Sequence, residues 1–179
     1  MIRKAEKRDL EAVDCLYQEI HDAESTGQIT MGWIRGVYPT RATAEAALAR
    51  DDLFVLEEDG CILGSGIINQ IQVDVYQGAP WNCQVPDDQV SVLHTLVISP
   101  SARGKGYGRS FILFYEAYSL EHGCSELRID TNERNLAARA MYSRYGYQEI
   151  GIVPTTFNGI PGVNLVLLEK HIQNESVTG

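Results

Sequence analysis

Apolar residues in the N-terminal part of the chain follow the spacing of helices. In residues 8–24 they recur every three or four positions, which predicts an amphipathic helix with Asp9 at its N-cap. These apolar positions are Leu10, Val13, Leu16, Tyr17 and Ile20. After an irregular stretch, Thr40 or Thr43 precedes an alanine-rich segment, residues 41–50, which predicts a second, shorter helix.

Further along, the pattern changes to runs of apolar and β-branched residues. Residues 52–73 predict two strands joined at Asp59-Gly60, a dipeptide typical of hairpin turns. Residues 74–88 are rich in glycine and proline and predict a loop. Residues 89–99 are β-branched and largely apolar, which is typical of a strand buried on both faces.

The C-terminal half mixes both patterns. It predicts helices over residues 110–122 and 135–145 and strands over residues 125–130, 147–157 and 163–170. The helix over 110–122 is apolar nearly all round, so we expect it to be buried and to end at Gly123. The last two strands flank Asn158-Gly159 and predict a hairpin. We expect one domain over residues 1–170 and a flexible tail over residues 171–179.

A glycine-rich stretch, SPSARGKGYGRS at residues 99–110, joins a predicted strand to a predicted helix. It contains the cations Arg103, Lys105 and Arg109 and the glycines Gly104, Gly106 and Gly108. Backbone N–H groups at a helix start lack intrahelical partners, and the helix dipole is positive there. Glycines let a phosphate approach such a backbone, so the stretch predicts a diphosphate site. The alternative is a glycine-rich turn with solvated cations.

Two common phosphate motifs fit this stretch poorly. The chain contains no G-x-x-x-x-G-K-S/T string, the motif of P-loop nucleotide-binding proteins. The dinucleotide motif G-x-G-x-x-G fails because Arg109 stands where its third glycine belongs. Asp130, at the end of the next strand, superficially fits the ribose-binding acid of that motif. An NAD-binding oxidoreductase is therefore the weaker alternative.

The stretch and a segment downstream resemble the GNAT family of N-acetyltransferases. RGKGYG, residues 103–108, fits the family motif R/Q-x-x-G-x-G/A, and LHTLVISP ahead of it is similar to the family's fourth strand. NLAARAMYSRYGY, residues 135–147, is similar to the family segment N-x-x-A-x-x-x-Y-x-x-x-G-F/Y. The similarity runs from about Val90 to Gly151, and elsewhere only the order of elements agrees.

The resemblance implies a fold and a donor substrate. The fold is α/β (α+β), with a mixed, mostly antiparallel sheet of six to seven strands flanked by about four helices. The donor is acetyl-CoA, whose pyrophosphate the glycine-rich stretch would bind. The cofactor-binding residues implied are Leu96, Val97, Ile98, Arg103, Gly104, Lys105, Gly106, Tyr107, Gly108, Arg109 and Asn135. Among these, the backbone of Leu96 and Ile98 would bind the thioester carbonyl and the pantetheine amide.

The resemblance also implies catalytic residues. Tyr142 would be the general acid beside the thioester sulfur, and Asn135, seven residues earlier on the same predicted helix, would contact the CoA arm. From the residues alone, the favoured interpretation is that Tyr142 is a packing residue and Asn135 a helix N-cap. His94 has an ordinary pKa near neutrality, so it is the candidate general base, and a water relay or a histidine with only a structural role remains open.

The acceptor side is predicted from the two irregular stretches. They hold the aromatic residues Trp33, Tyr38, Tyr76 and Trp81, which either line an acceptor pocket or close the core. Nearby acids could recruit a cationic amine, and they are Glu24, Asp74, Asp87 and Asp88. We therefore expect transfer of acetyl to a primary amine of a small molecule, by direct attack in a ternary complex. A non-catalytic acyl-CoA-binding or regulatory module on the same fold is the main alternative.

The amino-acid composition limits the classes of binding partner and the cellular compartment that we expect. Of the 179 residues, 44% are hydrophobic and 22% charged, and the formal net charge of −9 argues against nucleic-acid and membrane partners. The four cysteines form no C-x-x-C pair, so we expect free thiols and no metal site. The chain has no signal-peptide-like start and no long apolar run, so we expect a cytoplasmic protein. Both a monomer and a homodimer remain open.

Overall fold

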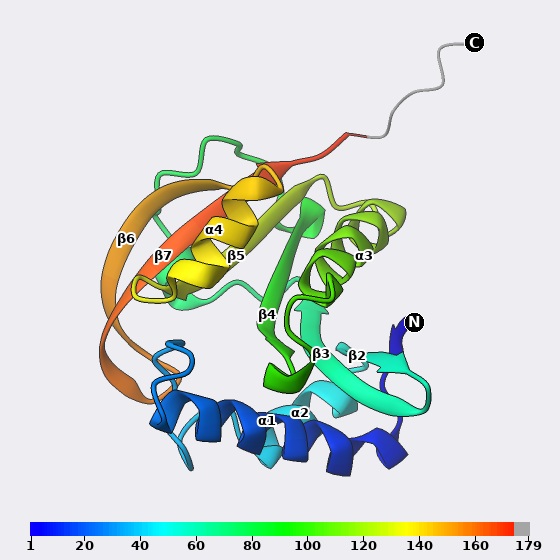
Figure 1. Cartoon of the computed structure of the whole chain (residues 1–179). Helices are drawn as coiled ribbons and strands as arrows, with labels where there is room; N and C mark the ends of the chain where they lie inside the picture. Colours follow the sequence, from blue (N-terminus) through cyan, green and yellow to red (C-terminus); the bar gives the residue numbers. More distant parts are fainter. Residues whose placement is uncertain (174–179) are drawn as a thin grey trace.

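The computed structural model describes residues 1–173 and contains one seven-stranded sheet (Figure 1). The strand order is β1-β2-β3-β4-β5-β7-β6. The strands are β1 (Ile2–Lys4), β2 (Leu53–Glu58), β3 (Cys61–Asn69), β4 (Val90–Ile98), β5 (Glu126–Asn132), β6 (Gln148–Phe157) and β7 (Ile160–His171). Among these pairs only β4 and β5 run parallel. The expected mixed, mostly antiparallel sheet is confirmed, and it differs from the parallel sheet of dinucleotide-binding folds.

Helices cover both faces of the sheet (Figure 1). They are α1 (Leu10–Ser25), α2 (Arg41–Ala49), α3 (Tyr107–Glu121) and α4 (Leu136–Arg144). On one face α1 and α2 pack on the β2–β3 side of the sheet, and the segment between β3 and β4 covers the β5–β7 side. On the other face α3 and α4 pack on the middle strands. None of these helices, within residues 1–173, is long and apolar enough to cross a membrane.

The predicted N-terminal elements are present, with one difference at Asp9. Thr40 caps α2 and forms a capping box with Thr43, and Asp59-Gly60 joins β2 to β3 with both residues at positive φ. Asp9 precedes α1, but its side chain makes no cap hydrogen bond there. Its carboxylate instead accepts from the Glu6 N–H and pairs with Arg3 at 2.7 Å. That ion pair fixes the start of α1 against β1.

The C-terminal half differs from the sequence prediction in two places. The helix predicted at residue 110 begins at Tyr107, and it buries one face only, since Leu113 on the other side is 44% exposed. β7 continues through His171, and the N–H of Ile172 donates to the Ser125 carbonyl, so this end is paired beyond the predicted boundary at residue 170. The rest of the predicted tail, residues 174–179, lies outside the described residues.

The pairing of β4 with β5 is short, and this positions the site. The two strands pair from Val90–Glu126 to Leu93–Ile129 only. Beyond that point they diverge, as Figure 1 shows between the labels β4 and β5. The separated ends carry backbone N–H and C=O groups on facing strand edges, and such groups require other partners.

Candidate active site

A cavity of about 830 Å³ opens where β4 and β5 separate. Its walls come from the second half of β4, the end of β5, the glycine-rich loop, α4 and the segment between α1 and α2. A volume of this size is typical of a ligand site. The cavity brings together His94, Leu96, Gly106, Asn135 and Tyr142, which the sequence placed in one site although they come from different elements.

β4 contains an irregularity in the wall of this cavity. Thr95 has a φ of 50°, which is rare for a β-branched residue and indicates local strain. The pairing with β3 shifts register here, so that neither Thr95 nor Leu96 has a partner residue in β3. The Thr95 hydroxyl is hydrogen-bonded to the Tyr38 hydroxyl. The irregularity therefore turns the backbone of β4 toward the cavity at the residues expected to meet a thioester.

The glycine-rich loop has the geometry of an anion site. Gly104 and Gly106 have φ of 78° and 83°, a conformation that residues with a Cβ rarely adopt. Gly106 is the N-cap of α3, so the free N–H groups of the first turn follow it directly. At Gly108 an added Cβ would lie 2.8 Å from the Met141 sulfur, so this glycine permits the close approach of α3 and α4.

The three loop cations are exposed and make no ion pair within residues 1–173. Arg103 and Arg109 line the cavity, together with Tyr107 and the three glycines. Lys105 is not among the residues that line the cavity. Two guanidinium groups beside a helix N-terminus with free N–H groups form a suitable binding site for a diphosphate.

Tyr142 and Asn135 both line the cavity from α4. The Tyr142 ring is buried against Tyr147, and its hydroxyl has no hydrogen-bond partner in the described part of the chain. Burial, followed by the nearby charge of Asp130, raises the pKa of Tyr142, so the phenol stays protonated and can donate. Asn135 is the N-cap of α4, since its Oδ1 accepts from Ala138 N at 3.2 Å. Its amide nitrogen is not used by that bond.

His94 is held by a chain of hydrogen bonds. Asn69 donates through Nδ2 to Asp52 at 2.8 Å, which turns its Oδ1 toward His94 Nε2 at 3.0 Å. Nε2 must then carry the proton, and Nδ1 is the basic nitrogen. Burial lowers the pKa of His94 to about 4. The imidazole is thus neutral at physiological pH but a weak base.

Asp130 is the acid that the structure places in the cavity. Its Oδ2 accepts from the Tyr76 hydroxyl at 2.7 Å, and burial raises its pKa to about 6. Its other oxygen has no hydrogen-bond partner among the described residues. The position of Asp130 in this cavity was not predicted from the sequence, although the end of a parallel strand beside a strand crossover is a recurrent ligand position.

The acceptor residues predicted from the irregular stretches divide into two pairs. Trp33 and Tyr38 line the cavity and meet edge to face. Tyr76 and Trp81 do not line it, because both are buried in the core between the β3–β4 segment and the sheet. Of the predicted acids, Glu24 holds the backbone N–H groups of residues 31 and 32, and the others lie outside the cavity wall.

Residues 15–147 match the acetyltransferase (GNAT) family. The match covers more than half of the chain, and the fold agrees with it, so this protein belongs to that family. The resemblance expected from the sequence is confirmed. A curated relative, the streptothricin acetyltransferase of Escherichia coli, is 28% identical over 108 residues, which span 60% of this chain and 59% of that protein.

Solved structures show the same fold over nearly the whole chain. A GNAT-family acetyltransferase from Streptococcus agalactiae has a TM-score of 0.81 at 22% identity and covers 97% of this chain and 96% of its own. A protein from Salmonella typhimurium, solved with its cofactor acetyl-CoA, has a TM-score of 0.69 at 15% identity and covers 100% of this chain and 97% of its own. These likenesses show that the overall fold is shared.

The environment of His94 predicts an unusual titration. Its ring resonances are expected to move near pH 4, and His94→Gln identifies them in the NMR spectrum. Because the folded-state pKa lies below the unfolded value of about 6.5, the unfolded chain binds the proton more tightly. The free energy of unfolding should consequently fall as the pH drops from about 6.5 toward 4, and fall less in His94→Gln. A ring that titrates above pH 6 would contradict this description of the site.

Proposed function

We propose that this protein transfers the acetyl group of acetyl-CoA to the primary amine of a small, cationic molecule, by direct attack in a ternary complex. One observation carries the proposal: a single cavity joins the glycine-rich loop, the β4 irregularity, Tyr142 and Asp130. These features suit, in turn, a diphosphate, a thioester carbonyl, a leaving thiolate and an ammonium group. A module that only bound acyl-CoA would require just the first two.

The donor half of the cavity accommodates the CoA moiety. The free N–H groups at the start of α3 and the side chains of Arg103 and Arg109 would bind the diphosphate. Between the loop and Tyr142, the cavity follows the edge of β4 that β5 leaves unpaired, where the pantetheine amides would find backbone partners. The structural neighbour from Salmonella typhimurium was solved with acetyl-CoA, which supports this choice of donor.

The chemistry has three requirements, and residues of the cavity can meet each. The amine attacks the thioester carbonyl, forming the C–N bond, and the C–S bond then breaks. The backbone N–H of Leu96 is the candidate donor to the developing oxyanion, because Leu96 has no partner residue in β3. Tyr142, kept protonated by its surroundings, would give its proton to the departing thiolate.

The third requirement is a base for the amine proton, and there the structure supports Asp130 over His94. A general base works best when its pKa is near the working pH. The pKa of Asp130 is raised to about 6, whereas that of His94 is lowered to about 4. Asp130 also carries the negative charge that attracts an ammonium group. His94 would then shape the cavity wall next to the β4 irregularity.

The acceptor half suits a cationic amine of small size. Trp33 and Tyr38 line the same cavity as Asp130, and aromatic rings together with a carboxylate favour a cationic ligand. The name of the Escherichia coli relative gives streptothricin as its acceptor, which makes streptothricin the first compound to test here. We extend the proposal to a cytoplasmic enzyme without nucleic-acid or membrane partners, a choice supported by its acidity and four free cysteines.

Replacement of the two arginines that line the cavity should weaken donor binding. Arg103→Gln and Arg109→Gln are each expected to raise the Kd for acetyl-CoA about tenfold, as charge-assisted hydrogen bonds typically contribute. Isothermal titration calorimetry measures this, with Arg8→Gln as an exposed control outside the cavity. Acetyl-pantetheine lacks the diphosphate and should bind more weakly than acetyl-CoA. Its Kd should therefore be the same in the wild type and in the arginine variants. An unaltered acetyl-CoA Kd in the double variant would contradict the diphosphate site.

The roles of the proposed proton-transfer residues can be distinguished by pH–rate profiles, in which the release of the CoA thiol is measured with one acceptor. In the wild type, kcat/KM is expected to fall as the pH drops through about 6, because Asp130 must be ionised. Asp130→Asn should lose most of the activity and the inflection near pH 6. His94→Gln should keep this inflection. Tyr142→Phe should lower kcat by about 10²–10⁴-fold with the Kd for acetyl-CoA unchanged.

Two outcomes of the rate measurements would count against these roles. If the inflection near pH 6 persists in Asp130→Asn and disappears in His94→Gln, the base is His94. If no primary amine, streptothricin included, releases thiol from acetyl-CoA while acetyl-CoA still binds, the protein is an acyl-CoA-binding module. The same acceptor is used for every variant, since the amine itself deprotonates with rising pH.

A further inference from the structure

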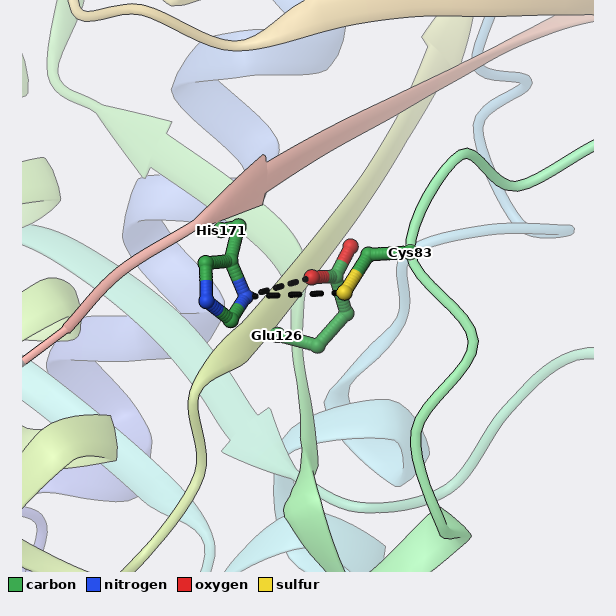
Figure 2. Close-up of side chains that lie close together, drawn as sticks. All are labelled: Cys83, Glu126 and His171. Carbon is green, nitrogen blue, oxygen red and sulfur yellow. Dashed lines mark hydrogen bonds and ion pairs between the residues drawn. The ribbon is translucent and has the colours of Figure 1, made fainter.

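A cluster of three potential metal ligands lies outside the catalytic cavity. Figure 2 shows Cys83, Glu126 and His171 with their side chains pointing toward one another. Glu126 and His171 are directly opposite each other on the paired strands β5 and β7, and Cys83 belongs to the segment that covers this face. Cys83 and His171 are 88 residues apart in sequence, so no local motif announces the cluster. None of the three lines the catalytic cavity.

The distances in the cluster match the edges of a tetrahedral zinc site. Zn–S bonds of about 2.3 Å and Zn–N and Zn–O bonds of about 2.0 Å place S and N about 3.5 Å apart and N and O about 3.3 Å apart. Here Cys83 Sγ is 3.6 Å and Glu126 Oε2 is 3.4 Å from His171 Nδ1. The three ligand atoms all lie within 4.8 Å of one another.

Hydrogen bonding among the three groups explains these distances less well. An N–H···O hydrogen bond is typically 2.7–3.2 Å long, shorter than the contact between His171 and Glu126. Nδ1 holds at most one proton, so hydrogen bonding of all three groups without an ion requires the Cys83 thiol to keep its proton and donate it. A single ion at the centre would contact all three atoms at once.

The buried carboxyl groups of Glu126 and Glu169 also favour a bound cation. Glu126 is fully buried, and its Oε1 has no hydrogen-bond partner within residues 1–173. Glu169, two residues before His171 on the same face of β7, is 4% exposed and likewise has an unpartnered oxygen, Oε2. Among the described residues, Arg128 is the only basic side chain buried close to both carboxylates, and it lies 4.0 Å from the centre of the Trp81 ring. Buried charges of this kind are normally paired or bound to a metal.

We propose that Cys83, Glu126 and His171 bind one divalent transition-metal ion of the zinc type, with a water molecule in the fourth position. Thiolate, imidazole and carboxylate ligands together favour Zn²⁺ over Mg²⁺ or Ca²⁺. Cys83 and His171 are partly exposed, so an ion can enter and the fourth position can be hydrated. This proposal departs from the sequence-based expectation of no metal site, which rested on the absence of local cysteine motifs.

The site would fasten the β3–β4 segment to the sheet. That segment already contacts this face through Asn82, whose N–H donates to Glu169 at 2.9 Å, and through Trp81 over Arg128. Tyr76, near the start of the same segment, hydrogen-bonds Asp130 in the catalytic cavity. A bound ion would therefore stabilise the segment that positions Asp130, without taking part in acetyl transfer.

The experiment uses the full chain treated with a chelator and then titrated with Zn²⁺ or Co²⁺. Wild type is expected to bind one equivalent, to show a thiolate-to-Co²⁺ charge-transfer band, and to gain several degrees in Tm with excess Zn²⁺. Cys83→Ser should lose the band, and His171→Gln should weaken binding at least tenfold. Both side chains are partly exposed, so both variants are expected to fold.

Matched controls identify the ligands. Cys61→Ser and His122→Gln alter an exposed cysteine and an exposed histidine elsewhere and should bind Co²⁺ like the wild type. The proposal is overturned if the wild type shows no thiolate band, or if Cys83→Ser keeps the same band and affinity. Because the readouts are binding and stability, the result does not depend on the identity of the acetyl acceptor.

Discussion

The short pairing between β4 and β5 is the constraint on which the site depends. Parallel pairing stops at Leu93–Ile129, and the strands then separate in the middle of a sheet whose other neighbours stay paired. The facing edges of β4 and β5 therefore lack hydrogen bonds to each other, and a ligand with amide groups can supply these hydrogen bonds instead. The strained backbone at Thr95 and the chain reversal at Gly104 and Gly106 both lie on the path from this gap to the start of α3.

The packing around the gap explains why it stays open. α3 and α4 hold one face of the middle strands, and α1 and α2 hold β2 and β3 on the other. The β3–β4 segment buries Tyr76 and Trp81 against β5 and β7, so each side of the gap has a core of its own. Tyr76 then extends its hydroxyl from that core to Asp130. One side chain thus links this core to the acid that lines the cavity.

Local chemistry made much of this architecture predictable. The turns at Asp59-Gly60 and Asn158-Gly159 follow from residues that tolerate positive φ, and the strand–loop–helix unit follows from apolar runs around the glycines. Features that depend on distant contacts were not predictable. No local pattern places Thr95 at positive φ, and the raised pKa of Asp130 depends on the burial of its side chain in the folded structure. Tyr76 and Trp81 looked like acceptor residues because aromatic content alone does not distinguish a pocket from a core.

The most direct test of the account is a crystal structure of the protein with acetyl-CoA. We expect the diphosphate on the N–H groups at the start of α3 and the pantetheine arm along β4. The thioester carbonyl should lie within hydrogen-bond distance of Leu96 N, with the sulfur beside the Tyr142 hydroxyl. Acetyl-CoA bound with its thioester outside the space between β4 and β5, or with its diphosphate away from Gly104–Arg109, would contradict it.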